Sequence, residues 1–138
     1  MMTISQAARR AGCGVETIRF YERQGLIERP PKPAAGFRRY PSEIVDRVRF
    51  IRQAQGLGFS LREIDELLSL RTDPSADCAD VRARASAKLD EVARKIAELE
   101  RVREALGELI EACPGDGAAR TCSILEALAH SGHHRIEG

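Results

Sequence analysis

The sequence contains no tryptophan, and its six other aromatic residues all lie before residue 60. The second half must therefore pack with Leu, Ile, Val and Ala alone, which is typical of a helix seam. No apolar run approaches the roughly 18 residues of a membrane-spanning helix, so no membrane partner is expected. The 138 residues suffice for one ordinary domain, or for one small domain with an extended element.

The N-terminal residues lack the apolar stretch of about 7 to 15 residues that a secretory signal contains, so we expect a cytoplasmic protein. Four cysteines in such a chain are not expected to form a disulfide framework and are interpreted as packing, redox or metal residues. The sequence also lacks a nucleophile with a nearby general base, because its three histidines cluster near the C-terminus. We therefore expect no enzymatic activity.

The net charge of +1 hides an asymmetry along the chain. Residues 1–54 carry 11 Lys and Arg against 5 Asp and Glu, whereas residues 55–138 carry 11 against 16. A charge excess is most often only a solvated face, but here basic residues recur on one predicted helix and on the loop that follows it. Such clustering favours attraction to the phosphates of double-stranded DNA.

Two short helices around a glycine turn are predicted at the N-terminus. The first has Ser5 as its N-cap and ends near Ala11, and the second spans residues 15–24 and stops at Gly25. This arrangement is typical of a helix-turn-helix. Three prolines exclude a helix over residues 27–40 and predict two short strands around a loop, which would form a wing.

Two further helices and a linker are predicted before residue 78. The third helix is expected to start at Ser42, as its N-cap, and to end near Gln55. The S-x-x-E pattern of residues 60–63 is a capping box and predicts a fourth helix to about Leu70. Residues 72–77, with a central proline, are expected to be a linker.

A proline-free stretch over residues 78–112 carries apolar side chains at steps of three or four. They are Val81, Ala85, Leu89, Val92, Ile96, Leu99, Val102, Leu106 and Leu109. The mean step of about 3.5 residues is the coiled-coil period. A helix of this length spans about 50 Å and cannot bury its stripe within one small chain, so a homodimer is predicted. We expect a mainly α fold, divided into a winged helix-turn-helix domain at 1–71, a linker at 72–77, a dimerisation helix at 78–112, and a loop, short helix and tail at 113–138.

The cysteines at the ends of this helix indicate a metal site. Cys78 and Cys113 would lie about 50 Å apart in one chain, but an antiparallel dimer places Cys78 of one chain beside Cys113 of the other. Cys122 follows a glycine-containing loop that can fold back to the same place. Three thiolates select soft metal ions, whereas zinc would require a fourth ligand. Cys13, between two glycines, is interpreted as a packing residue.

Three runs of the sequence resemble the DNA-binding domain of the MerR family of transcription regulators. They are VETIRFYERQGLIERP, GFRRY and RVRFIRQAQGLGFSLREIDELL, and the resemblance covers nearly all of the first 71 residues. It implies a winged helix-turn-helix and an antiparallel coiled-coil dimer. It also implies a regulator that sits on a promoter with an overlong spacer, together with RNA polymerase, and distorts that promoter when its effector binds in the C-terminal half.

The positions of Cys78, Cys113 and Cys122, with spacings of 35 and 9, are similar to those of the mercury-sensing branch of this family. The resemblance implies that these thiolates bind Hg(II) and thereby switch on metal-resistance genes. Pb(II) or Cd(II) is the alternative effector, since related lead and cadmium sensors use a similar cysteine set. These sensors also tend to carry a cysteine in the helix-turn-helix turn, the place that Cys13 occupies here. A thiol redox sensor is a further alternative. The histidines of the tail, at positions 130, 133 and 134, are further possible ligands, although such tails are more often disordered.

The predicted DNA interface combines the second helix with the wing. We expect the helix to enter the major groove and the wing to hold the phosphate backbone. The expected contact residues are Thr17, Arg19, Tyr21, Phe37, Arg38, Arg39 and Arg52.

Overall fold

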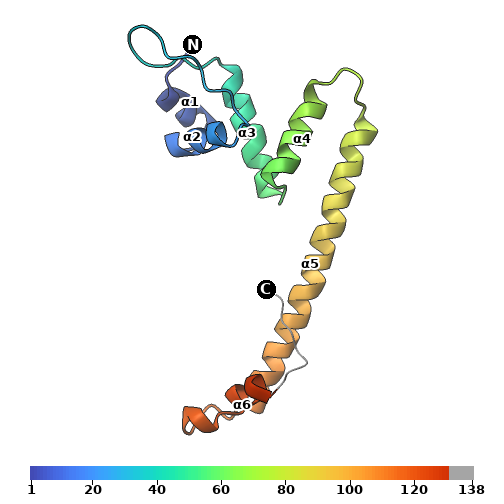
Figure 1. Ribbon diagram of the computed structural model, residues 1–138. Coiled ribbons are helices and arrows are strands. Elements are labelled where there is room, and N and C mark those ends of the chain that lie inside the picture. Colours follow the sequence, from blue (N-terminus) through green and yellow to red (C-terminus); the bar gives the residue numbers. More distant parts are fainter. Residues whose placement is uncertain (131–138) are drawn as a thin grey trace. The chain divides into compact units, whose positions relative to one another are not determined.

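The computed structural model describes residues 1–130, which form six α-helices and one short 3-10 helix (Figure 1). They are α1 (Ile4–Ala11), α2 (Val15–Arg23), α3 (Glu43–Gly56), α4 (Leu61–Thr72), α5 (Cys78–Ala112), η1 (Ala119–Thr121) and α6 (Ser123–His130). The chain divides into two compact units, Met1–Ala85 and Ser86–Gly138. Over the described residues, no helix is both long enough and apolar enough to cross a membrane.

The first unit is built around a small aliphatic core. Its fully buried large side chains come from α2, α3 and α4, and they are Ile18, Val48, Ile51 and Ile64. α1 contributes only alanines to this core, and their small side chains let α1 lie close against α3. The predicted pair of helices around a glycine turn is confirmed, and α2 stops one residue earlier than predicted. Gly25 follows it with a φ of +76°, the left-handed conformation expected at a helix end.

Two helices, α1 and α4, start at capping boxes. The predicted N-cap Ser5 is wrong, because Thr3 caps α1 together with Gln6. The Thr3 hydroxyl accepts from the Gln6 backbone N–H at 3.2 Å, and the Gln6 side chain accepts from the Thr3 N–H at 2.9 Å. Two reciprocal bonds satisfy more of the unpaired amides of the first turn than a single serine would. The capping box of Ser60 and Glu63 at the start of α4 is confirmed.

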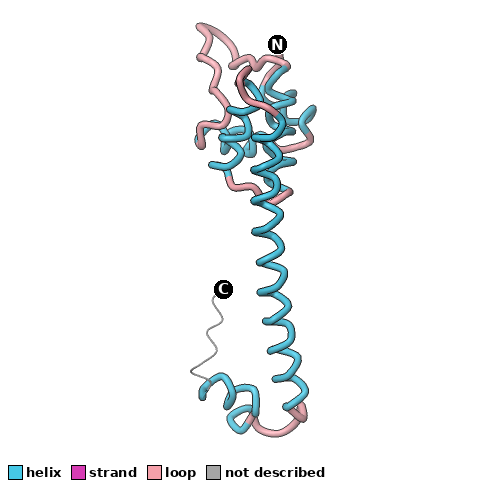
Figure 2. The backbone as a smooth tube through the Cα atoms, turned by 90° about the vertical axis from the view of Figure 1, so that its right-hand side faces the viewer, coloured by secondary structure: helices cyan, strands magenta, loops and turns pink. Residues whose placement is uncertain are grey.

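The predicted strands of the wing are absent, and the described chain contains no strand at all (Figure 2). Within residues 1–130 a single isolated bridge forms, in which Met2 and Tyr40 exchange backbone hydrogen bonds of 2.9 and 2.7 Å. The prolines of residues 27–40 lack the N–H groups that a ladder requires, so the wing is a loop. Ser42 is the N-cap of α3, as predicted, but its backbone is already helical, with φ −61° and ψ −27°, and its side chain makes no capping bond.

The second unit contains most of α5, the following loop and α6. α5 spans the residues over which the apolar periodicity predicts a helix. Its large apolar side chains are exposed along much of its length, including Leu89, Val92, Ile96, Leu99, Leu106 and Ile110. After α5 the chain reverses through a loop, in which Gly115 has a φ of +81°. The Ser123 hydroxyl donates to the Ala112 carbonyl at 3.1 Å and so ties the start of α6 to the end of α5.

Candidate nucleic-acid interface and thiol pair

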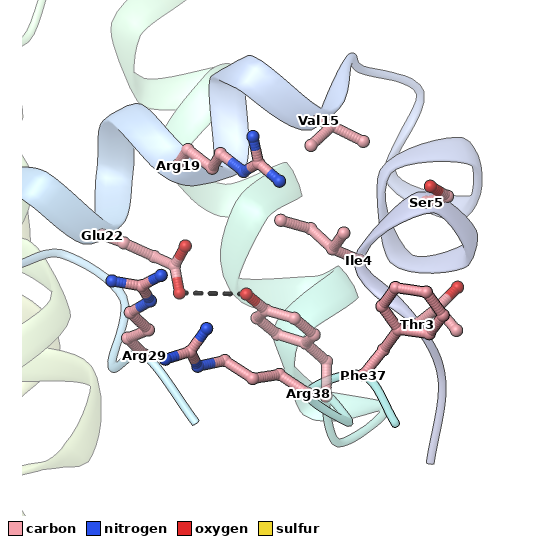
Figure 3. Close-up of a pocket in the computed structure, with 10 residues that line it drawn as sticks. Thr3, Ile4, Ser5, Val15, Arg19, Glu22, Arg29, Phe37 and Arg38 are labelled. Atoms are coloured by element: carbon pink, nitrogen blue, oxygen red, sulfur yellow. Dashed lines mark hydrogen bonds between the residues drawn. The ribbon is translucent and has the colours of Figure 1, made fainter. Parts of the chain in front are cut away.

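A depression of about 400 Å³ lies between α1, α2 and the wing loop (Figure 3). Arg19 of α2 and Arg29 and Arg38 of the loop line it, together with Thr3 and Ser5 at the start of α1 and one carboxylate from α2. Three guanidinium groups against one carboxylate give the depression an excess of positive charge. Guanidinium groups form paired hydrogen bonds with phosphate oxygens, so this surface is suited to a nucleic-acid backbone.

The arginines of this depression are held to different degrees. Arg38 is half-buried, and its Nε donates to the Pro30 carbonyl at 2.9 Å across the base of the loop. Arg19 is exposed and pairs with Glu16 at 3.6 Å on the same helix. An exposed pair of this kind contributes little energy, so the Arg19 guanidinium can exchange it for a phosphate. Phe37, at the same depression, is 79% exposed.

The structure corrects the prediction for Tyr21. This side chain is only 2% exposed, and its hydroxyl donates to Gln55 Oε1 at 2.6 Å. Its ring packs in the core with Ile18, three residues earlier on the same helix face. Tyr21 therefore joins α2 to α3 instead of reaching DNA bases.

Arg52 and Arg49 of α3 bind the exposed carbonyls at the end of α1. Arg52 Nη1 donates to the Ala11 and Gly12 carbonyls at 3.2 and 2.6 Å, and Arg49 Nη2 donates to the Arg10 carbonyl at 2.5 Å. A helix C-terminus presents unpaired carbonyls with partial negative charge, which cations stabilise. The predicted DNA contact Arg52 thus supports the turn between α1 and α2, although it also borders a shallow surface depression that contains the half-buried Thr17.

Arg38 and Arg39 are neighbours in sequence but line different depressions. Arg39 borders a cavity of about 860 Å³ between the loop prolines and the start of α3. Successive side chains of an extended segment point to opposite sides, which accounts for this separation. Arg29 is not among the contacts predicted from the sequence, where its only signal is a positive charge next to the first loop proline.

The loop after α5 brings two thiols together. Cys113 directly follows α5, Cys122 directly precedes α6, and their Sγ atoms lie 3.8 Å apart. Both side chains are half-buried, whereas Cys78, the first residue of α5, is exposed. No cluster of three or more His, Cys, Asp or Glu side chains suited to a metal occurs among residues 1–130. One chain therefore offers two adjacent thiols at this place.

The pKa values of Cys122 and Cys13 are shifted in opposite directions. The backbone N–H groups of Leu125 and Ile124, in the first turn of α6, lower the pKa of Cys122, and its hydrogen bond with Cys113 adds to this effect. In the turn after α1, burial raises the pKa of Cys13, and the charge of Arg52 opposes this only in part. The thiolate is the form that binds metals and reacts with electrophiles, so Cys122 is the more reactive of the two.

We expect iodoacetamide to alkylate Cys122 at lower pH than Cys13. A lowered pKa gives a larger thiolate fraction at a given pH. As the pH is raised, the alkylation rate of Cys122 should therefore increase before that of Cys13. Peptide mass spectrometry across a pH series measures both residues in one sample. Coincident profiles, or a Cys13 profile that rises first, would contradict this ranking.

The His130 side chain pairs with Glu126 at 3.2 Å across one turn of α6 and is exposed. His133 and His134, the other possible tail ligands, lie outside the described residues.

Comparison with known proteins gives consistent matches over the whole length. Residues 2–70 match the family described as MerR HTH family regulatory protein, and residues 45–109 match the family described as MerR, DNA binding. The mercuric resistance operon regulatory protein of Serratia marcescens is 43% identical over 127 residues, which cover 92% of this chain and 87% of that protein. The HTH-type transcriptional regulator CueR of Salmonella typhimurium is 38% identical over 136 residues, or 99% and 98% of the two chains.

A solved structure extends this similarity to the fold. The crystal structure of the transcription regulator PbrR691 from Ralstonia metallidurans, in complex with lead(II), superimposes with a TM-score of 0.83. The two sequences are 35% identical, and the match covers 93% of this chain and 99% of that one.

Proposed function

The chain belongs to the MerR family of transcription regulators, whose members are not enzymes, and we propose that it switches a promoter in response to mercury(II). The observation that carries this proposal is the thiol pair of Cys113 and Cys122, 3.8 Å apart, in a chain with a third thiol at the other end of the same helix. The family relationship establishes a metal-responsive regulator that acts on promoter DNA. The choice of mercury, the dimer and the ligand set are our proposal.

The exposed apolar stripe of α5 supports a homodimer. In one chain Ile96 and Leu99 are 52% and 67% exposed, which is unfavourable for large aliphatic side chains on a long helix. A second copy packed along the stripe would remove them from water. In an antiparallel pair, each end of the seam would join Cys78 of one chain with Cys113 and Cys122 of the other, because a 35-residue helix is about 50 Å long.

The basic depression supports promoter binding. We propose that α2 enters the major groove with Thr17, that Arg19 contacts a phosphate at the edge of the groove, and that Arg38 contacts the backbone beside it. Phe37 and Arg39 of the wing loop are proposed as further contacts. Metal binding at the ends of α5 would change how the two DNA-binding units sit on the promoter and so present it to RNA polymerase in a distorted form.

Mercury is our first choice because three thiolates form a soft donor set and because a relative with 43% identity is named as a mercuric resistance regulator. Lead(II) or cadmium(II) is the second candidate. The lead-bound PbrR691 structure, which superimposes with a TM-score of 0.83, is the reason for considering lead.

In vitro transcription from the native promoter distinguishes these ions. With the free concentration of each metal buffered, we expect Hg(II) to activate at the lowest concentration and Zn(II) not to activate. If Pb(II) activates transcription while Hg(II) binds without activating it, the protein is a lead(II) sensor. Activation by a thiol oxidant without metal would instead support redox sensing.

We expect Arg19→Ala to weaken binding to the operator and to random DNA alike, by about tenfold, because a phosphate contact carries no sequence information. The slope of log affinity against log salt should fall by about one unit. Fluorescence anisotropy at several salt concentrations measures both quantities. Arg62→Ala, an exposed arginine of α4 outside the depression, is the control. An unchanged slope for Arg19→Ala would remove Arg19 from the interface.

A further inference from the structure

Glu22 is the single carboxylate among the residues that line the basic depression, and it does not pair with any of the three arginines there. Instead its Oε2 accepts a hydrogen bond of 3.0 Å from the hydroxyl of Tyr40 (Figure 3). We propose that this bond is a latch between the wing loop and α2, the recognition helix that enters the major groove; this proposal rests on the proposed DNA-binding function. Tyr40 is then a positioning residue for the arginines that contact phosphate.

Tyr40 is placed to join three segments of the first unit. Its ring is buried, at 2% exposure, and its backbone exchanges two hydrogen bonds with Met2 at the N-terminus. Its hydroxyl reaches Glu22 on α2, while Tyr40 itself ends the wing loop. The wing loop forms no strand, so only a few contacts hold it. At its start the Leu26 N–H donates to the Tyr21 carbonyl of α2 at 3.0 Å, whereas at its end the Tyr40 hydroxyl supplies the side-chain bond to α2. The latch therefore fixes the loop where it meets the recognition helix.

The latch also determines where the charges of the depression lie. The guanidinium groups of Arg29 and Arg38 act on the phenol from nearby and oppose the rise of its pKa, although burial and Glu22 together still raise that pKa to about 12. Tyr40 therefore remains a protonated donor at physiological pH. The hydroxyl holds the Glu22 carboxylate through Oε2, and in this arrangement the carboxylate pairs with neither Arg29 nor Arg38. Both cations thus stay available to phosphate.

Arg38 is the residue through which the latch acts most directly. It lies two residues before Tyr40, and its Nε is held on the Pro30 carbonyl at 2.9 Å on the other side of the loop. With Tyr40 fixed on one side and Pro30 on the other, the Arg38 guanidinium has little freedom to leave the depression. Loss of the Tyr40 hydroxyl would release the loop and free Glu22 to pair with a neighbouring arginine.

The test uses Tyr40→Phe in the full-length protein, with DNA affinity and melting temperature measured together. The variant keeps the buried ring and removes only the donor. We expect its affinity for operator and random DNA to fall about tenfold, with a smaller salt slope, as for loss of one hydrogen bond to a charged group. Glu22→Gln, which retains an acceptor oxygen for the phenol, should bind DNA at least as well as the parent.

Two further variants separate positioning from general stability. Ile64→Val is a buried change in α4 that also lowers the melting temperature modestly, and it should leave the DNA affinity unchanged. In an Arg38→Ala background, Tyr40→Phe should cost less affinity than it does in the parent, because one of the arginines that the latch positions is already absent. A merely structural tyrosine would give additive losses.

Several outcomes would overturn the latch. Tyr40→Phe with the affinity and salt slope of the parent would do so, and so would losses that add to those of Arg38→Ala. Both leave the proposed function intact, since the parent still binds DNA. A parent protein without salt-dependent DNA binding would instead refute the proposed function, and the latch with it.

Discussion

A Leu99→Lys chain is expected to be a monomer that no longer binds its operator tightly. Leu99 is 67% exposed on α5 of the single chain and belongs to the apolar stripe that we place in the dimer seam. A lysine there would bury an unpaired charge against the partner helix, at a cost of several kcal/mol. Operator affinity should fall with dimerisation, because a monomer reads one half-site instead of two.

Analytical ultracentrifugation and a gel shift on the same preparation measure both effects. Glu98→Lys is the matched control, since it introduces the same side chain at the adjacent exposed position outside the stripe. That variant should remain a dimer and bind DNA. A dimeric Leu99→Lys protein would place the seam on a different face of α5.

The helices were largely predictable because their signals are local. The stretch of residues 78–112 has no proline and keeps a period of about 3.5, which leaves a helix as the only regular structure that suits it. The capping box of Ser60 and Glu63 similarly involves residues three apart in sequence. At α1 the N-cap is Thr3 instead of the predicted Ser5, because Gln6 completes a reciprocal box with Thr3.

The parts that escaped prediction depend on contacts between distant segments. Arg52 carries the charge of a DNA contact, but its partners are carbonyls about forty residues earlier, at the end of α1. Tyr21 has the polar hydroxyl of a DNA contact, but its spacing from Ile18 places it on the buried face of α2. The proximity of Cys113 and Cys122 was easier to foresee, because a short glycine-containing loop joins them. The partner of Tyr40 had no sequence signal at all.

We expect Cys113→Ala to lose at least about 100-fold in Hg(II) affinity. Loss of a residue that merely supports a metal ligand costs about 10- to 100-fold, and removal of a thiolate ligand should cost more. Equilibrium dialysis against a competing small thiol measures the metal retained per dimer. Cys13→Ala is the matched control, because Cys13 lies in the first unit at the turn after α1 and should not affect mercury binding. Retention of tight binding by Cys113→Ala would remove Cys113 from the site.

Metal binding should also weaken as pH falls. Protons compete with the metal for the thiolate. Because the pKa of Cys122 is lowered, its thiolate persists, and continues to bind the metal, to lower pH than an ordinary cysteine would.

Mercury binding by mixed dimers tests the shared site most directly. Cys78→Ala and Cys113→Ala chains are combined after unfolding, and the mixed dimer is isolated by two different affinity tags. If each site takes Cys78 from one chain and Cys113 with Cys122 from the other, neither homodimer retains mercury tightly. The mixed dimer would then regain one complete site, because the first variant supplies Cys113 and Cys122 while the second supplies Cys78. We predict one tightly bound Hg(II) per mixed dimer, and a mixed dimer that binds none would contradict the shared three-thiolate site.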